Sequence, residues 1–197
     1  MHEVAKRLIP QLVPWITTGV VAKGKIVQAG VTQARALVRH KAGKEVEFGL
    51  PYLLSRLGGG YLFGTMIRGA VDESKMPLQA LAGYREIFGP QAPPALVVYD
   101  RGGYATATLR ALAKEGVKAL GIQPKGHGAW YVAEAVRATV RSERGKTEGI
   151  IGTLKTDKYG FNKPKERLWQ TLEMAGPRSI LSYNLNKLMR VLRRADR

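Results

Sequence analysis

The apolar positions of this chain form short runs and helical repeats that alternate along the sequence. Residues 95–99 and 118–122 are short, mostly apolar runs, which are typical of strands buried on both faces. Residues 46–54 and 61–68 flank three glycines at 58–60, which predicts a hairpin because glycine readily adopts the positive φ values of tight turns. A further short strand is expected at 35–39.

Helical spacing of apolar residues separates these strands. It predicts helices over 77–88 and 104–115, the first ended by Gly89-Pro90 and the second by Gly116. A short helix is expected at 3–16, broken near Pro10 and Pro14, and three more helices near 144–155, 165–174 and 178–193. Strands that alternate with helices indicate an α/β layer fold with a mixed sheet.

Composition narrows the class of protein. The chain has 197 residues, 45% of them hydrophobic, which suits one domain with a real core. The sequence holds no cysteine, so disulfides and thiolate metal sites are excluded and a reducing compartment is expected. No apolar run approaches the roughly 20 residues that span a bilayer. We therefore expect a cytoplasmic protein without a membrane partner.

Charge points to a polyanionic partner. The formal net charge is +17, with basic residues spread along the chain and denser from Arg178 to Arg197. Such a field favours nucleic acid over an anionic membrane or an acidic protein. A ribosome-like protein, or a merely soluble basic surface, is the simpler alternative.

Asp100 is the first candidate for chemistry. It directly follows the apolar run at 95–99 and precedes Arg101-Gly102-Gly103. Ligands bind at the carboxyl ends of strands in open α/β sheets, and two glycines let the backbone turn sharply beside the carboxylate. The alternative is an aspartate that starts a turn and caps the next helix.

Glu148 is the second candidate. Arg144 lies four residues before it and Lys155 seven residues after it, which places all three on one helix face. An acid between two cations suits a metal with phosphates, although a solvated row of ion pairs has the same spacing. Three poor helix formers, Gly145, Gly149 and Gly152, indicate that something large packs close to this helix.

These motifs together resemble the DDE transposases of bacterial insertion sequences. The likeness rests on Asp100-Arg-Gly and on the spacing of Arg144, Glu148 and Lys155, with Arg141 where the family has tyrosine. It also rests on Glu47-Phe-Gly, on 84–89, on Gly160-Phe-Asn-Lys-Pro and on Asn184-Leu-Asn186. The resemblance covers roughly residues 25–192. It implies an RNase-H-like mixed five-stranded sheet flanked by helices over residues 25–197, preceded by a remnant linker or helix at 1–24.

The resemblance also implies a chemistry. Family members use three carboxylates and two divalent cations, Mg²⁺ or Mn²⁺, to cleave DNA and transfer strands. Asp100 and Glu148 would then be catalytic and metal-binding residues. Arg144 and Lys155 would contact DNA, and we add Arg101 and Lys146 to that set. The implied partners are insertion-sequence ends and target DNA, bound by a homodimer at the bacterial nucleoid.

The first acid of the family pattern is missing. It would lie on a first strand near 25–39, yet no Asp or Glu occurs between Glu3 and Glu45. Asp72 could substitute, although we favour it as a helix cap over a ligand. The family's usual upstream DNA-binding domain is also absent, so the chain resembles a truncated member. The alternatives are therefore an active transposase, a catalytically degenerate DNA-binding remnant, or an unrelated RNA-binding protein.

Overall fold

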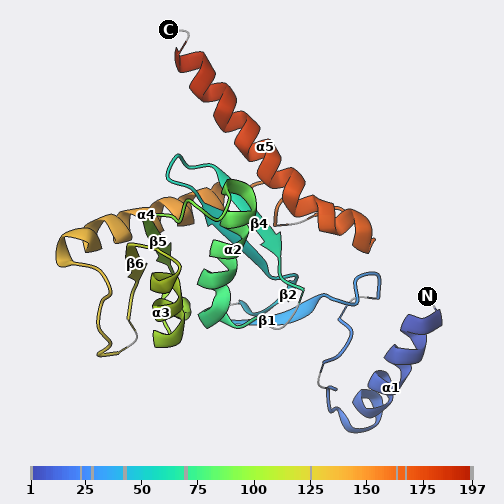
Figure 1. Cartoon of the computed structure of the whole chain (residues 1–197). Helices are drawn as coiled ribbons and strands as arrows, with labels where there is room; N and C mark the ends of the chain where they lie inside the picture. The colour runs from blue at the N-terminus through green and yellow to red at the C-terminus, as the bar shows by residue number, and fades with distance from the viewer. Residues whose placement is uncertain are drawn as a thin grey trace.

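The chain forms an α/β structure in which a central body carries two projecting helices. A computed structural model describes residues 2–22, 24–27, 29–41, 44–68, 71–124, 126–162, 164–166 and 168–195, with backbone alone at 37–41 and 44–48 (Figure 1). The strands are β1 (Arg35–Lys41), β2 (Lys44–Gly49), β3 (Tyr52–Arg56), β4 (Leu62–Met66), β5 (Leu96–Tyr99) and β6 (Ala119–Ile122). The helices are α1 (His2–Thr18), α2 (Met76–Phe88), α3 (Thr106–Lys114), α4 (Glu134–Leu154) and α5 (Trp169–Ala195), with 3-10 turns η1 (Glu73–Lys75) and η2 (Arg101–Gly103).

The described strands pair two by two. β1 pairs antiparallel with β2, β3 pairs antiparallel with β4, and β5 pairs parallel with β6. The β3–β4 hairpin turns at the glycines where the sequence predicted it, with Gly60 at a φ of 80°. Strands 95–99 and 118–122 are confirmed within one residue as β5 and β6.

The predicted five-stranded RNase-H-like sheet is wrong. Its first strand was expected within 25–39, next to the strand that ends at Asp100. In the structure Arg35–Lys41 instead forms a separate ribbon with Lys44–Gly49. No described strand therefore lies between β3 and β5 to join the two pairs into one sheet.

β5 is less buried than its apolar sequence predicted. All four residues of β5 are only partly buried, whereas three of the four in β6 are buried. Leu120 and Ile122 of β6 pack with Leu109 and Leu112 of α3 in the largest core cluster. Leu81 of α2 joins the same cluster, so α2 and α3 hold this strand pair on one side.

A second core cluster holds the hairpin against α5. Buried Leu62 of β4, Leu154 of α4 and Ile180 of α5 form it. The side-chain amide of Asn184 on α5 accepts from the backbone N–H of Leu62 at 2.9 Å and donates to its carbonyl at 2.8 Å. The outer edge of β4 is thereby hydrogen-bonded to α5.

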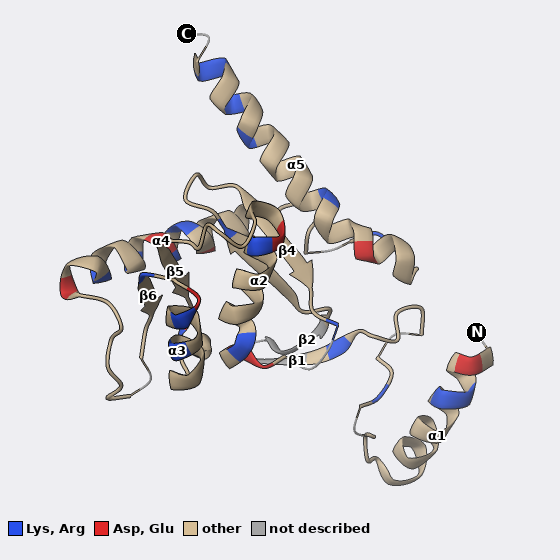
Figure 2. Cartoon of the chain, in the orientation of Figure 1, with Lys and Arg blue, Asp and Glu red and all other residues tan. Residues whose placement is uncertain are grey.

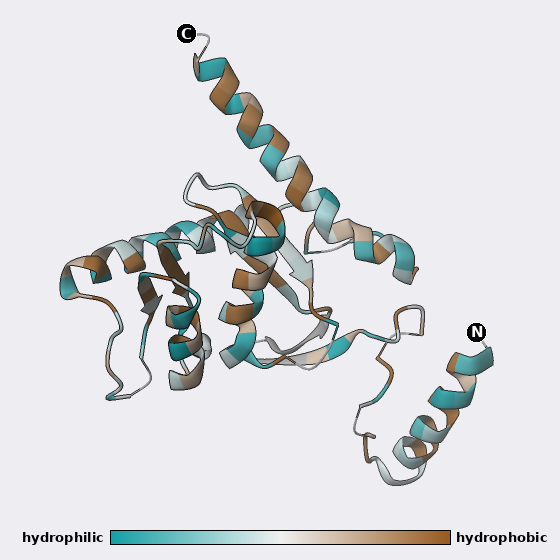
Figure 3. Cartoon of the chain, viewed as in Figure 1, coloured by the Kyte–Doolittle hydropathy of each residue, from teal (hydrophilic) through white to brown (hydrophobic). Residues whose placement is uncertain are grey.

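The terminal helices extend from this body (Figure 1). α1 runs through Pro10 and Pro14 without the predicted break, and none of its residues is buried. The helices expected at 165–174 and 178–193 are one helix, α5, which contains Pro177. Figure 3 shows apolar residues along the projecting part of α5, where Leu181, Leu185, Leu188 and Leu192 are exposed. No helix in the described part of the chain is long and apolar enough to cross a membrane.

A close approach of backbone to side chain fixes the turn after β5. A Cβ atom on buried Gly103 would collide with the Tyr99 ring and lie 2.8 Å from Cγ of Pro77. We predict that Gly103→Ala lowers the free energy of unfolding by about 1–3 kcal/mol, because the added Cβ would have to displace both rings. Urea unfolding measures this change.

Gly145→Ala is the matched control. A Cβ atom there meets nothing within 4 Å, and the residue lies inside helix α4. Alanine should therefore raise the free energy of unfolding by up to about 1 kcal/mol. Equal effects of the two substitutions would contradict the packing described at Gly103.

Candidate functional site

Helix α4 is positioned directly on β6 by a glycine. A Cβ atom on Gly121 would lie 2.6 Å from Cγ2 of Val140, so only glycine leaves space for this side chain. Val140 is 1% exposed. Arg144 lies one turn further along α4 and Glu148 one turn beyond that, on the same side of the helix. The helix therefore carries both side chains across the end of β5, where Asp100 begins the next turn.

Arg144 brings the two candidate acids together. One guanidinium nitrogen lies 2.9 Å from Oδ1 of Asp100 and 3.9 Å from Oε1 of Glu148. These two oxygens are thus separated by at most the sum of the distances, 6.8 Å. Asp100 and Glu148 are 73% and 74% exposed, so the pair faces solvent. Figure 2 shows where acidic and basic residues lie along α4 and after β5.

The turn after β5 fixes the backbone at Asp100. Oδ1 of Asp100 accepts a hydrogen bond from the backbone N–H of Arg101 at 2.7 Å, which starts η2. The carboxylate of Glu73 packs against Gly102, where a Cβ atom would collide with it. η1 thus lies against η2, and a further carboxylate, Glu73, approaches the turn that Asp100 begins.

Asp72 has a local role in the structure. Its carboxylate accepts from the backbone N–H of Ser74 at 3.1 Å and from the Ser74 hydroxyl at 2.6 Å. Asp72 thus caps the 3-10 turn η1, whereas α2, the helix that it was expected to cap, begins after Lys75 without a side-chain cap. The hydrogen bonds from Ser74 are the main reason that the pKa of Asp72 lies below its usual value.

The predicted DNA-contacting residues differ in whether the described structure holds their charges in ion pairs. Lys155 follows the last turn of α4 and is exposed, as is Arg101 in η2. Lys146 instead forms an ion pair with Glu143 at 2.7 Å. No described neighbour lies within 4 Å of a Cβ position on Gly145, Gly149 or Gly152, so the large neighbour that we expected beside these glycines is not found in the described structure.

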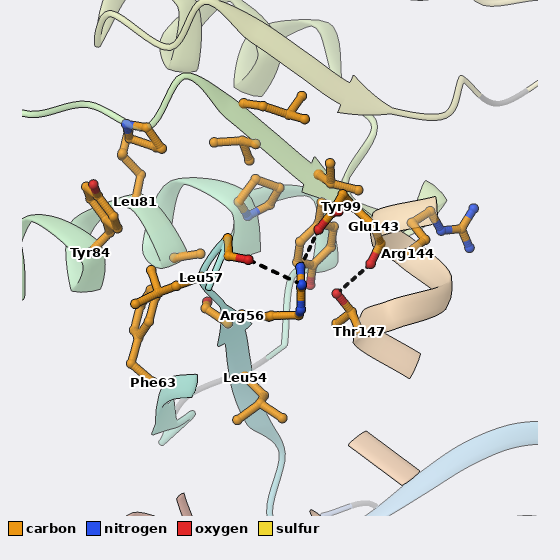
Figure 4. A pocket seen from close by; sticks show the side chains of 18 of the residues that line it. Leu54, Arg56, Leu57, Phe63, Leu81, Tyr84, Tyr99, Glu143, Arg144 and Thr147 are labelled. Atoms are coloured by element: carbon orange, nitrogen blue, oxygen red, sulfur yellow. Dashed lines mark hydrogen bonds and ion pairs between the residues drawn. The ribbon is translucent and has the colours of Figure 1, made fainter. Parts of the chain in front are cut away.

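A cleft of about 920 Å³ opens beside the acid pair (Figure 4). β3, β5, α2 and α4 line it, and Asp100, Arg144 and Glu148 lie among its lining residues. Arg56 of β3 crosses the cleft to Glu143 of α4, forming an ion pair that ties the hairpin to the helix. The hydrogen bond from Lys146 and the adjacent Arg56 hold the pKa of Glu143 below its usual value, against the opposing effect of burial.

Sequence reasoning missed Arg56, Glu143 and Glu73. Arg56 was readable as a lone cation in the mostly apolar run 53–57, where a half-buried charge needs an opposite partner. Glu143 precedes Arg144 and shares no sequence pattern with Arg56, which is 87 residues away. Only the folded arrangement brings these two residues together.

The donor atoms at the site suit a hard cation in part. Carboxylate oxygens are the ligands that Mg²⁺ and Mn²⁺ prefer, and Asp100 and Glu148 supply them from two elements. Within the residues that the structure describes, no group of three or more acidic or histidine side chains is arranged to hold a metal ion. The described residues therefore offer two protein carboxylates to a cation, and the Arg144 guanidinium lies between them.

Comparisons with protein-family models, with curated proteins and with solved structures gave no match to this chain.

The surroundings of Tyr99 at the end of β5 shift the pKa of its phenol. Burial, together with the negative charges of Glu73 and Asp100, raises its pKa to about 12. The folded state therefore holds the phenol proton more tightly than the unfolded state, whose pKa is near 10. This contribution to stability is complete below pH 10 and is lost as the pH rises toward 12.

We predict that Tyr99→Phe weakens the fall in unfolding free energy between pH 10 and pH 12, because it removes one group with a raised pKa. Urea unfolding at several pH values measures the slope for both proteins.

Glu73→Gln should lower the pKa of Tyr99, seen by ultraviolet absorbance of the phenolate. An unchanged phenolate titration in Glu73→Gln would contradict the placement of Glu73 beside Tyr99.

Proposed function

We propose that this chain acts on DNA by transposase-type, metal-dependent cleavage and strand transfer at phosphodiesters. The observation that carries the proposal is the meeting of Asp100 and Glu148 at one Arg144 nitrogen, from segments more than 40 residues apart. The net charge of +17 supports a polyanionic substrate. The family resemblance of the Asp100 and Arg144–Glu148–Lys155 motifs supports DNA as that substrate.

The protein residues supply positioning and charge. Asp100 and Glu148 would hold Mg²⁺ or Mn²⁺, and a bound cation would activate an oxygen nucleophile and neutralise charge at the phosphate. Arg144 reaches both acids from a half-buried stem, so its position is fixed by packing as well as by charge. The bare backbone at Gly145, Gly149 and Gly152 leaves space beside Glu148 for a phosphodiester backbone.

A second candidate function is DNA binding without cleavage. The observation that favours it is the lack of a third acid or histidine grouped with Asp100 and Glu148 among the described residues. Arg144 already neutralises part of the charge of both acids, so the pair is stable without a cation. This candidate corresponds to a degenerate transposase remnant that keeps the basic surface.

Nicking of supercoiled plasmid DNA tests the first proposal. We expect wild-type protein to nick in Mg²⁺ or Mn²⁺ and not in EDTA, because carboxylates alone do not activate water at a phosphodiester. Asp100→Asn and Glu148→Gln should reduce nicking to background while DNA binding persists, because each removes one metal ligand and one negative charge. Agarose gels measure nicking, and fluorescence anisotropy measures binding.

Glu134→Gln is the matched control, because Glu134 lies on α4 in its exposed first turn and makes the same change of charge. It should nick like the wild type. Nicking that is unaffected by Asp100→Asn and Glu148→Gln would defeat the catalytic assignment. Binding without any nicking by the wild type would favour the second candidate.

The salt dependence of DNA affinity distinguishes basic residues that contact phosphates from basic residues that do not. Each phosphate contact contributes about 0.9 to the slope of log affinity against log salt on duplex DNA. We predict that Arg101→Gln and Lys155→Gln each reduce this slope by about that amount, because both residues are exposed, Arg101 directly after Asp100 and Lys155 about two turns beyond Glu148 at the end of α4. Anisotropy titrations at several salt concentrations measure the slopes.

Lys146→Gln should change the slope less, because the Lys146 ammonium is engaged by Glu143 at 2.7 Å. Equal slopes for wild type, Arg101→Gln and Lys155→Gln would place the DNA elsewhere on the chain. The homodimer on DNA, and the location at the bacterial nucleoid in the cytoplasm, stay predictions of the family resemblance.

A further inference from the structure

The two strand pairs on either side of the cleft have outer edges that are already engaged. On the outer edge of β4, the Asn184 amide bonds to both backbone groups of Leu62. On the outer edge of β6, Leu120 forms an antiparallel bridge with Tyr131. Both outer edges thus have hydrogen-bonding partners within the chain.

The inner edges face the cleft without strand partners. The backbone of Leu57 donates to Tyr61 and that of Pro51 accepts from Ile67, so odd-numbered residues of β3 point toward β4. Backbone groups alternate along a strand, so those of Tyr52, Leu54 and Arg56 point to the opposite edge. No described strand pairs with that edge of β3.

The same alternation holds on β5. The carbonyl of Ala95 accepts from Ala119 of β6, so residues 95, 97 and 99 point toward β6. The backbone groups of Leu96 and Val98 point the other way. Consecutive residues 52–58 and 94–100 line the cleft, as expected where a space is bordered by strand edges rather than by sheet faces.

Charge distinguishes among occupants of the cleft. Two basic residues, Arg56 and Arg144, and three acidic ones, Asp100, Glu143 and Glu148, line it. The lining is therefore close to neutral, in contrast to the +17 of the whole chain, and does not suit a polyanion. An electrically balanced, largely apolar space fits an uncharged segment of polypeptide.

An unpartnered donor adds a second observation. The side chain of Arg56 is 10% exposed, and its buried Nε has no hydrogen-bond partner in the described structure. A buried donor of this kind costs free energy until an acceptor reaches it. Arg56 lines the cleft and lies across it in Figure 4, so an occupant with carbonyl oxygens can satisfy this group.

We propose that the cleft between β3 and β5 receives an extended strand of a partner polypeptide, which hydrogen-bonds to both inner edges. β3 has five residues, so the paired part of the added strand is about 17 Å long at 3.4 Å per residue. Strand addition to exposed edges is an established mode of peptide recognition, in which backbone bonds give affinity and alternate side chains give specificity.

The helices that form the two walls of the cleft determine which side chains suit the added strand. The wall of α2 presents Pro77, Ala80, Leu81 and Tyr84, so residues facing it are apolar. The wall of α4 is mostly polar, with Thr139, Glu143, Arg144, Thr147 and Glu148 beside one apolar residue, Ile151, so most residues facing it are polar. The occupant alternates apolar and polar residues with a period of two. This proposal does not depend on the proposed action on DNA.

A pool of capped nine-residue peptides that alternate Val, Leu or Ile with Thr or Ser tests the proposal. Isotope-labelled full-length chain is titrated with each peptide and followed by NMR and amide hydrogen exchange. The best binder should slow exchange at Leu54 and Val98, whose N–H groups face the cleft. Its counterpart with alternate amides N-methylated should bind about ten-fold more weakly, because it lacks backbone donors.

Two variants control for the site. Ala80→Trp fills the cleft from α2 and should abolish binding, whereas Gln79→Trp, on the exposed side of α2, should bind like the wild type. Unchanged thermal melting shows that both variants fold. Failure of every peptide to bind, equal binding of the N-methylated peptide, or full protection of Leu54 and Val98 in the free chain would each overturn the proposal. A dimer that Ala80→Trp abolishes would assign the cleft to a second copy instead.

Discussion

Helix α4 lies directly on β6 because residue 121 is glycine, and this contact sets the position of almost everything functional. With Val140 seated 2.6 Å from where a Cβ of residue 121 would be, successive turns of α4 follow a fixed path. That path brings Glu143 to Arg56 of β3 and Arg144 to Asp100. Leu154, at the far end of α4, is fully buried against the hairpin and α5. Helix α4 therefore fixes the positions of the two strand pairs and of the acid pair relative to one another.

The same constraint explains why the cleft stays open. α4 joins the pairs on one side through Val140 and Glu143, and α2 joins them on the other through Leu81 and a ring contact between Phe63 and Tyr84. The two strand pairs are thus held by helices and not by hydrogen bonds to one another. No described strand pairs with their inner edges, and backbone groups without partners are costly when shielded from water. An arrangement fixed from outside in this way can accept a strand with little rearrangement.

Much of the local structure could be predicted from the sequence, and the sheet could not. The hairpin at Gly58–Gly60, β5, β6 and α2 follow from turn residues and periodicity, which are local properties. The approach of Asp100 to Glu148 was implied by the family resemblance, since neither the strand-end acid nor the helical spacing alone predicts it. The predicted sheet failed because strand pairing is non-local: nothing in residues 35–41 shows that they pair with 44–49 and leave β5 with one neighbour among the described strands. The apolar sequence of β5 predicted a fully buried strand, and a second neighbouring strand would be needed to bury it fully.

Arg144 both bridges the acid pair that is proposed to act on DNA and lines the cleft that is proposed to bind a strand. It lines the cleft, and its nitrogen is shared by two largely exposed acids, so its charge is already divided between them. A strand that fills the cleft would shield Arg144 from water on one side and strengthen its attraction to both carboxylates, because screening falls as water is excluded. The positions of Asp100 and Glu148 would then be held more firmly than in the open chain. Occupancy of the cleft and order at the acid pair are therefore coupled through a single guanidinium, whichever function the acid pair performs on DNA.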